Sequence, residues 1–320
     1  MSAGKSTLLN AMIGKQLLPS KCTACTASVF SITDIDGMKD FRVRARRNSK
    51  RPTPWKRATL PLLERMNESG YSKIEIEGDL KRIANYKKKF RVSFIDTPGP
   101  NNSCDSTHAE LLHTALKSSD YTALIVVLNA STLRTTDEYN LLHDIAEYLK
   151  ANRGTTDVLF VLNRIDAFFH GRQCAGSAAE IVEATQKFLT GTFGFISPIV
   201  MPVWSTLALE CRQVMSRELD LMTEDDEDDL MLATKKARFH VREILEAQRV
   251  GCCASTVEKC VVTGARRKDI YLPNSRMRIT VPDLKQAEFL SGVPAVEKWA
   301  AGQLKRHFKA LETARKGNIR

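Results

Sequence analysis

The hydrophobic positions between residues 121 and 205 follow two patterns in turn. Runs of mostly apolar residues, typical of buried strands, are followed by longer stretches whose apolar residues recur every three or four positions, which is typical of helices on a sheet. The strand patterns are YTALIVVLNA (121–130), DVLFVLN (157–163) and PIVMPV (198–203), and the helical patterns are 135–152 and 178–193. This alternation predicts an α/β fold with a mostly parallel sheet covered by helices on both faces.

The residues before 121 extend this pattern less regularly. Gly4 precedes a helical pattern that Gly14 and Pro19 bring to an end. Strand patterns follow at 27–35, 39–45 and 90–100, and a helix is predicted at 108–119. We interpret the strand at 90–100 as buried and as ending in a Gly/Pro turn. Residues 72–80 fit either a short strand or the entry to a helix.

Beyond Ser205 the strand and helix alternation stops. We predict helices at 206–222 and 233–250 around an acidic loop, EDDEDD (224–229), and a long terminal helix at 291–316, whereas 251–284 shows no clear pattern. The change in composition predicts three parts, which are a core at 1–210, a charged and mainly helical insertion at 211–290, and a terminal helix at 291–320 that closes the core.

Composition excludes several classes of protein. The chain has 320 residues, 43% hydrophobic and 7% aromatic, which predicts a soluble globular core. No apolar run approaches the roughly 20 residues that a membrane-spanning helix needs. The eight cysteines come without a signal peptide, so we expect reduced thiols in a cytosolic protein. The pair Cys22-x-x-Cys25 lacks a second pair that would complete a metal site, which favours ordinary thiols.

The net charge of +11 is concentrated in RVRARRNSKRPTPWKR (42–57), in KKKFR (87–91) and in the last helix. Such runs suit an anionic lipid surface or a nucleic acid, and a solvated loop is the simpler alternative. Trp55 is the one aromatic residue among the basic residues of 42–57, so nucleic-acid binding is not expected.

Candidate chemistry begins at Gly4-Lys5-Ser6, the second half of the phosphate-binding pattern G-x-x-x-x-G-K-[ST]. Before a helix, backbone N–H groups and the helix dipole favour a polyphosphate. Lys5 would add a charge on the β/γ oxygens, and the Ser6 hydroxyl would complete Mg²⁺ coordination. Alone, these residues would fit an ordinary helix N-cap equally well.

Two further motifs follow predicted strands. FIDTPG places Asp96 where its carboxylate can hold a Mg²⁺ water and the Gly99 amide where it can meet a γ-phosphate, although the same letters could form a simple turn. VLNRID supplies Asn163 and Asp166, and the Asp166 carboxylate would accept two hydrogen bonds from the N1–H and N2–H₂ edge of guanine. Adenine offers no such pair. Arg164 stands where Lys is usual and can stack on the base similarly.

With these motifs the chain resembles the bacterial dynamin-like GTPases. The resemblance includes SAGKSTLLNAMIGKQLLPS, CTACTA, FIDTPGPNNSCDSTHAE, FVLNRIDAF, PVWSTLALE and LSGVPAVEKWAAGQL, and covers nearly the whole chain. It implies a P-loop GTPase fold with GTP and Mg²⁺ as ligands. Thr26 would be the switch threonine that closes on Mg²⁺ and the γ-phosphate. Ser2 and Thr7 would lie near the phosphates, and Ser205 would supply a backbone contact to the guanine oxygen.

The chain departs from that family at both ends. The first P-loop Gly and the strand before it, which would be central in the sheet, do not precede Gly4, and the family's helical stalk does not follow the terminal helix. We therefore expect Met1 to be an internal methionine, a late start codon or a fragment boundary. We also expect the chain as written to bind guanine nucleotide in the high micromolar range or weaker, with little turnover.

The leading hypothesis is a GTPase whose catalytic set is Lys5, Ser6, Thr26 and Gly99, and whose cycle, in a full-length parent, drives self-assembly and membrane remodelling or tethering. We expect a homodimer through the GTPase face, and a cytoplasmic location with peripheral contact to anionic membrane through the stalk or the basic segments. Two alternatives stay open. One is a nucleotide-dependent interaction module with negligible turnover, and the other is an inactive fragment.

Overall fold

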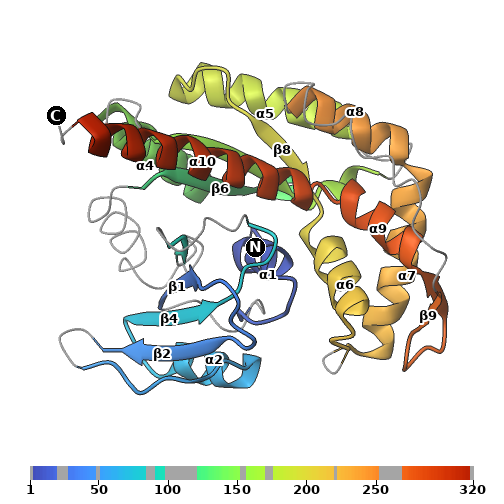
Figure 1. Cartoon of the computed structure of the whole chain (residues 1–320). Helices are drawn as coiled ribbons and strands as arrows, with labels where there is room; N and C mark the ends of the chain where they lie inside the picture. The colour runs from blue at the N-terminus through green and yellow to red at the C-terminus, as the bar shows by residue number, and fades with distance from the viewer. Residues whose placement is uncertain are drawn as a thin grey trace.

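The computed structural model describes residues 3–19, 28–47, 51–83, 91–97, 121–151, 156–169, 176–219, 222–251 and 269–317. Its strands form two larger sheets and one hairpin, and helices pack around them (Figure 1). The helix after Gly4, α1 (Lys5–Ile13), lies near the centre of the molecule and packs against residues of both larger sheets. This helix ends at Gly14, in the left-handed conformation that favours glycine at a C-cap.

The first sheet has five strands in the order β3-β2-β4-β1-β5, and only β1 and β4 are parallel. The strands are β1 (Val29–Asp34), β2 (Arg42–Arg46), β3 (Lys56–Arg57), β4 (Lys73–Gly78) and β5 (Ser93–Asp96). Alternate residues such as Phe30, Val43 and Ile74 form a buried face that packs against α1 and α2 (Leu60–Glu68). The opposite face is polar, with Arg42 and Arg44 on β2 paired to Glu77 and Glu75 on β4.

The second sheet has the order β6-β7-β8 and is entirely parallel. Its strands are β6 (Ala123–Asn129), β7 (Asp157–Asn163) and β8 (Val200–Val203). One face packs against α4 (Thr136–Ala151) and α5 (Ala178–Phe193), and the other against α1, α6 (Ser205–Ser216) and α10 (Val293–Gly317). Parallel strands buried on both faces are the arrangement that the continuous apolar runs predict.

The elements after α6 are α7 (Glu224–Phe239), α8 (Val241–Gly251), β9 (Asp269–Tyr271), β10 (Arg278–Thr280), α9 (Val281–Leu290) and α10. Among them, α10 crosses the second sheet, whereas α7, α9 and β9 lie to one side of it, near α6 (Figure 1). Leu230, Ile244 and Leu284 from these helices belong to the same apolar core as Phe160 of β7. Short 3₁₀ turns, η1 (Ala130–Thr132) and η2 (Ile165–Phe168), follow β6 and β7.

A fully buried arginine connects four of these helices. The Arg212 side chain, on α6, is 1% exposed and donates from Nε to Glu288 of α9 at 2.8 Å and from its terminal nitrogens to Glu297 of α10 at 2.7 and 3.0 Å. It also donates to the backbone oxygen of Ala11 in α1. Burial raises the pKa of Glu297, and the charge of Arg212 opposes that shift.

The structure confirms the α/β fold with a helical C-terminal portion. The predicted helices after Gly4, at 135–152, 178–193 and 291–316 and the strands at 27–35, 39–45 and 121–130 are present, and 72–80 is a strand. The helix predicted at 108–119 lies outside the described residues. The division at residues 210 and 290 stays a prediction; α6 runs across residue 210 without interruption.

Two predictions about this fold were wrong. The acidic run at 224–229 is not a loop but the start of α7, because carboxylates are favourable at a helix N-terminus and Thr223 with Asp226 forms a capping box. The strand β5 is not buried throughout. Ser93 and Ile95 are exposed, because β5 stands at the end of its sheet and, among the described residues, nothing covers that face.

The helical prediction at 233–250 needed one refinement. It is divided at His240 into the end of α7 and the start of α8. In the part of the chain that the structure describes, no helix combines the length and the apolar character that crossing a bilayer requires.

Candidate nucleotide-binding site

The first turn of α1 begins at Gly4, which is in the left-handed conformation with φ 84°. Among the described residues, no side chain caps this helix end. A Cβ atom at Gly4 would lie 2.3 Å from Nδ2 of Asn163, so only glycine fits both the backbone conformation and the space. This geometry suits the phosphate-binding role that the sequence motif predicts.

The hydroxyl of Ser6 donates a 2.8 Å hydrogen bond to Oδ2 of Asp96, which ends β5 and is 3% exposed. Burial raises the pKa of Asp96, while the charge of Lys5 and the Ser6 hydrogen bond oppose that shift. Burial also lowers the pKa of Lys5, and the negative charge of Asp96 opposes it. The site thus holds an ammonium, a hydroxyl and a carboxylate side by side, and these oxygen donors fit the hard ligands that Mg²⁺ prefers.

The Asn163 side chain, at the end of β7, joins three segments of the chain. Its Nδ2 donates to the backbone oxygen of Ala3 at 3.0 Å, and its Oδ1 accepts from Oγ of Ser205 at 2.9 Å and from the Ser205 backbone N–H at 3.2 Å. Asn163 is 3% exposed and Ser205 1%. The residues before α1, the end of β7 and the start of α6 therefore meet at one amide.

The turn after β7 carries the predicted base-recognition residues. Arg164 adopts the left-handed conformation with φ 64°, and Asp166 lies in the first turn of η2. A lysine from α7, Lys236, donates from Nζ to the backbone oxygen of Asp166 at 2.8 Å. The backbone of this turn is thus held from outside the motif.

The structure brings together most of the predicted site residues that it describes. Lys5, Ser6 and Asp96, predicted for the phosphate end, lie together, and Asn163 and Ser205 are in direct contact. Thr7 is partly buried in the first turn of α1. The Ser205 N–H donates to Asn163 in this structure, so its predicted contact to guanine would require that bond to change or be shared. Ser2, Thr26 and Gly99 lie outside the described residues.

Sequence reasoning missed three polar residues around this region. Lys236 lies in α7, and Glu210 of α6 has Asp166, Asp226 and Asp229 near enough to affect its titration. Burial and these carboxylates raise the pKa of Glu210 to about 8. Asn129, which pairs with Asn163 in register, has a buried Nδ2 that no described residue hydrogen-bonds. Only Asn129 had a usable signal, as a polar residue that ends an apolar strand.

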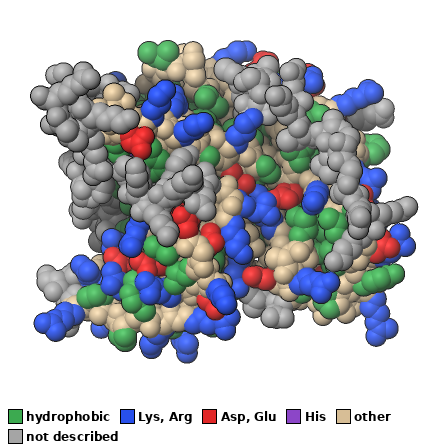
Figure 2. All heavy atoms as spheres, in the orientation of Figure 1, with side chains coloured by type: hydrophobic (Ala, Val, Ile, Leu, Met, Phe, Trp, Pro, Cys, Tyr) green, Lys and Arg blue, Asp and Glu red, His purple; other side chains and the backbone are tan. Residues whose placement is uncertain are grey.

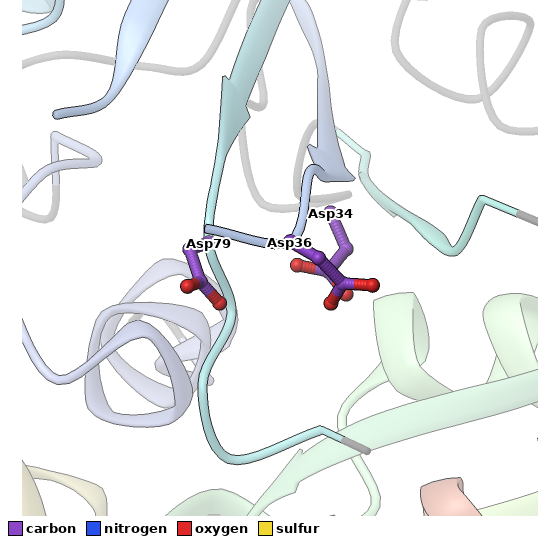
Figure 3. Close-up of side chains that lie close together, drawn as sticks. All are labelled: Asp34, Asp36 and Asp79. Carbon is purple, nitrogen blue, oxygen red and sulfur yellow. The ribbon is translucent and has the colours of Figure 1, made fainter. Parts of the chain in front are cut away.

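A separate group of carboxylates lies at the far end of the first sheet. Oxygens of Asp34, Asp36 and Asp79 lie within 4.8 Å of one another (Figure 3). Asp34 accepts a hydrogen bond from the Leu80 N–H at 2.8 Å and Asp79 accepts one from the Gly37 N–H at 3.1 Å. Burial, with the neighbouring carboxylates, raises the pKa of Asp34. These bonds stabilise the two turns, and nothing further indicates a metal site.

The chain was compared with known proteins. A family model described as the Dynamin family matches residues 1–165, and no curated protein matches. Two solved structures of an oligomerised bacterial dynamin pair, described as a mechanism for long-range sensing and tethering of membranes, are similar at 15% and 16% identity with TM-scores of 0.48 and 0.47. Each covers 78% of this chain, which spans only 38% and 39% of those chains.

The family match spans more than half of the 320 residues. It includes the start of α1, Asp96 and Asn163, which are the residues that the fold gathers at one site. The chain therefore belongs to the dynamin family and carries a dynamin-superfamily GTPase domain.

Proposed function

We propose that this GTPase domain binds GTP with Mg²⁺ at the N-terminus of α1 and hydrolyses it. The observation that carries the proposal is the contact between Ser6 and Asp96, with Lys5 held beside them. A hydroxyl, a carboxylate and an ammonium meet at a helix N-terminus that no side chain caps. This combination is suited to a triphosphate with its divalent cation.

The base end supports guanine. In the proposal Asp166 accepts the N1–H and N2–H₂ hydrogen bonds of guanine, and Arg164 stacks on the base. Asn163 holds this end to the phosphate end through its bonds to Ala3 and Ser205. One amide therefore links the two parts of the proposed site, the residues before α1 and the start of α6.

Hydrolysis would proceed by in-line attack of water on the γ-phosphorus, which breaks its bond to the β–γ bridging oxygen and releases GDP and inorganic phosphate, the water proton passing to the phosphate products or to solvent. Lys5 would offset negative charge on the β/γ oxygens, while Ser6 and Asp96 would hold the Mg²⁺ shell. Mg²⁺, held by Ser6 and Asp96, would supply positive charge that offsets the charge developing on the phosphates. Thr26 and Gly99, outside the described residues, keep their proposed roles at the γ-phosphate, and a second protomer or a monovalent cation would complete the charge balance.

Calorimetric titration with a non-hydrolysable GTP analogue tests binding. Lys5→Met should lose at least tenfold in affinity, since a hydrogen bond to a charged group contributes about 1.5–3 kcal/mol. Lys15→Met is the matched control, because Lys15 lies just after the same helix and pairs with Glu218 at the surface. Equal affinities in Lys5→Met and wild type would contradict the phosphate assignment.

The rate of GTP turnover distinguishes a GTPase from a nucleotide-dependent interaction module. Phosphate release measured over a range of protein concentrations should rise per molecule as the chain associates, if a second protomer completes the site. Tight GTP binding with slow release that does not depend on concentration would instead favour a nucleotide-dependent interaction module.

Self-assembly and membrane remodelling or tethering complete the proposal for a longer protein. The support here is family membership and a surface rich in Lys and Arg on β2 and β3, where the guanidinium carbons of Arg42 and Arg44 lie 4.6 and 4.5 Å from the centroid of the Trp55 ring. Lys and Arg side chains gather along this lower edge of the molecule (Figure 2). Co-sedimentation with vesicles containing phosphatidylserine, compared with neutral vesicles, tests membrane contact.

A further inference from the structure

The turn that carries Asp166 receives a contact from a helix far away in the sequence. Lys236 of α7 follows Asp166 by 70 residues, and its Nζ donates to the Asp166 backbone oxygen at 2.8 Å. This helix comes from the charged region that sequence analysis placed outside the core. In Figure 1 α7 lies beside α6 and α9.

The Lys236 ammonium also faces the start of α6, the second segment beside the proposed base site. Nζ of Lys236 lies 5.7 Å from the centroid of the Trp204 ring, a cation–π distance. Trp204 is 8% exposed and directly precedes Ser205, whose hydroxyl donates to Asn163. Lys236 therefore contacts the turn after β7 and lies over the ring at the start of α6, which are the two segments that flank the proposed base site.

Contacts at both ends of α7 hold in place the helix that carries Lys236. Near the N-terminus of α7, the fully buried Glu227 accepts hydrogen bonds from the backbone N–H groups of Asn274 and Ser275. At the C-terminus, the His240 ring stacks on Phe169, just after η2, with centroids 5.7 Å apart and an interplanar angle of 19°. Because both ends of α7 are held, the backbone at Lys236 stays within reach of the Asp166 turn.

The local charge gives Lys236 a second effect. Asp166, Asp226 and Asp229 lie near enough to Glu210 for their charges to raise its pKa, so this part of the molecule is acidic. The Lys236 ammonium, in contact with the Asp166 backbone oxygen, places a positive charge within this acidic region.

We propose that Lys236 is a positioning residue for base selection, which holds the Asp166 turn and the Trp204–Ser205 junction so that the Asp166 carboxylate meets both donors of guanine. The inference rests on the proposed function. It makes guanine selectivity depend on α7, a helix outside the nucleotide-binding motifs.

The test compares GTP with ITP, which lacks the N2 amino group and so loses one of the two donors. Affinities are measured by competition against a fluorescent GDP analogue in wild type, Lys236→Met, Lys236→Gln and Lys236→Arg. Lys235→Met is the matched control, because Lys235 is the exposed neighbour on the same helix. Thermal unfolding of each variant accompanies the titrations.

We expect the GTP-to-ITP affinity ratio to fall at least about fivefold in Lys236→Met and Lys236→Gln, the loss expected for about 1 kcal/mol. Lys235→Met should keep the wild-type ratio and Lys236→Arg should recover most of it. A role in stability alone would weaken GTP and ITP equally, and an unchanged ratio in both neutral variants would overturn the inference. A wild-type chain that binds neither nucleotide would overturn the proposed function and this inference together.

Discussion

The Ser6 hydroxyl donates to the Asp96 carboxylate across 2.8 Å, although 90 residues separate the two in the chain. Ser6 belongs to the first turn of α1 and Asp96 ends β5, at the edge of the five-stranded sheet. This contact joins α1 to the first sheet. It also leaves the two oxygen donors close enough to share the shell of one cation.

Ser6→Ala should weaken Mg²⁺-dependent GTP binding by at least about 1.5 kcal/mol, because a ligand to the cation shell is lost. Isothermal titration in Mg²⁺ measures the effect. The same titrations in EDTA are the control, since without the cation the wild type and the variant should differ much less. An equal loss in both conditions would point to a folding defect rather than to cation binding.

Asp166→Asn should shift base preference from GTP toward xanthosine triphosphate. The amide of Asn presents a donor where the carboxylate accepted one, and xanthine offers an acceptor at that edge. Competition titrations with the two nucleotides give the preference directly. Unchanged GTP affinity in this variant would rule out Asp166 as the guanine-reading residue.

Gly4→Ala should cost both stability and nucleotide affinity, whereas Gly14→Ala should cost stability alone. The two glycines have nearly equal φ values of 84° and 82°, so both substitutions bring a left-handed strain of about 1–2 kcal/mol. Only at Gly4 would the new Cβ lie 2.3 Å from Nδ2 of Asn163. Denaturant unfolding measures the cost of backbone strain in both variants, and GTP titration measures the added effect of the clash with Asn163. Similar GTP affinities in Gly4→Ala and Gly14→Ala would contradict a binding role for Gly4.

Glu210→Gln should stabilise the chain more at pH 8 than at pH 5. Burial first, and then Asp226, Asp229 and Asp166, raise the pKa of Glu210 from 4.5 to about 8. Between these values the folded chain keeps a proton that the unfolded chain loses, so stability falls with rising pH by at most about 1.4 kcal/mol per unit and levels above pH 8. The Gln side chain does not titrate and removes this loss.

Urea unfolding at pH 5, 6, 7 and 8 measures that difference, with Glu246→Gln on the exposed surface of α8 as the control. The gap between Glu210→Gln and wild type should widen steadily with pH. A constant gap would show that Glu210 titrates normally in the folded chain.

Arg212→Met should destabilise the chain by about 3–5 kcal/mol, because Glu288 and Glu297 lose a buried partner. The triple variant Arg212→Met, Glu288→Gln, Glu297→Gln should recover much of that loss, since it leaves no uncompensated charge. Arg306→Met, which breaks an exposed pair with Asp157, is the surface control and should cost less than about 1 kcal/mol. A single variant as stable as this control would contradict the role of the buried network.

The sequence determined the local elements, including the helix that follows Gly4. The apolar runs before Asn163 and Asn129 predict buried strands, and β6 and β7 confirm them. Gly4-Lys5-Ser6 predicts a loop that opens a helix, and α1 starts there. These features depend on residues adjacent in the chain, on period and backbone conformation, so no distant contact is needed to recognise them.

The tertiary structure alone decided which charges are buried and which face of a strand is covered. Arg212 and Lys236 read as ordinary charged helix residues, because their partners Glu297 and Asp166 lie 85 and 70 positions away. Whether a charged side chain can be buried depends on whether the fold places a partner beside it, and the residues adjacent in the chain do not indicate that. For the same reason the acidic run at 224–229 looked like a loop until α7 placed it at a helix N-terminus, where negative charge is favourable.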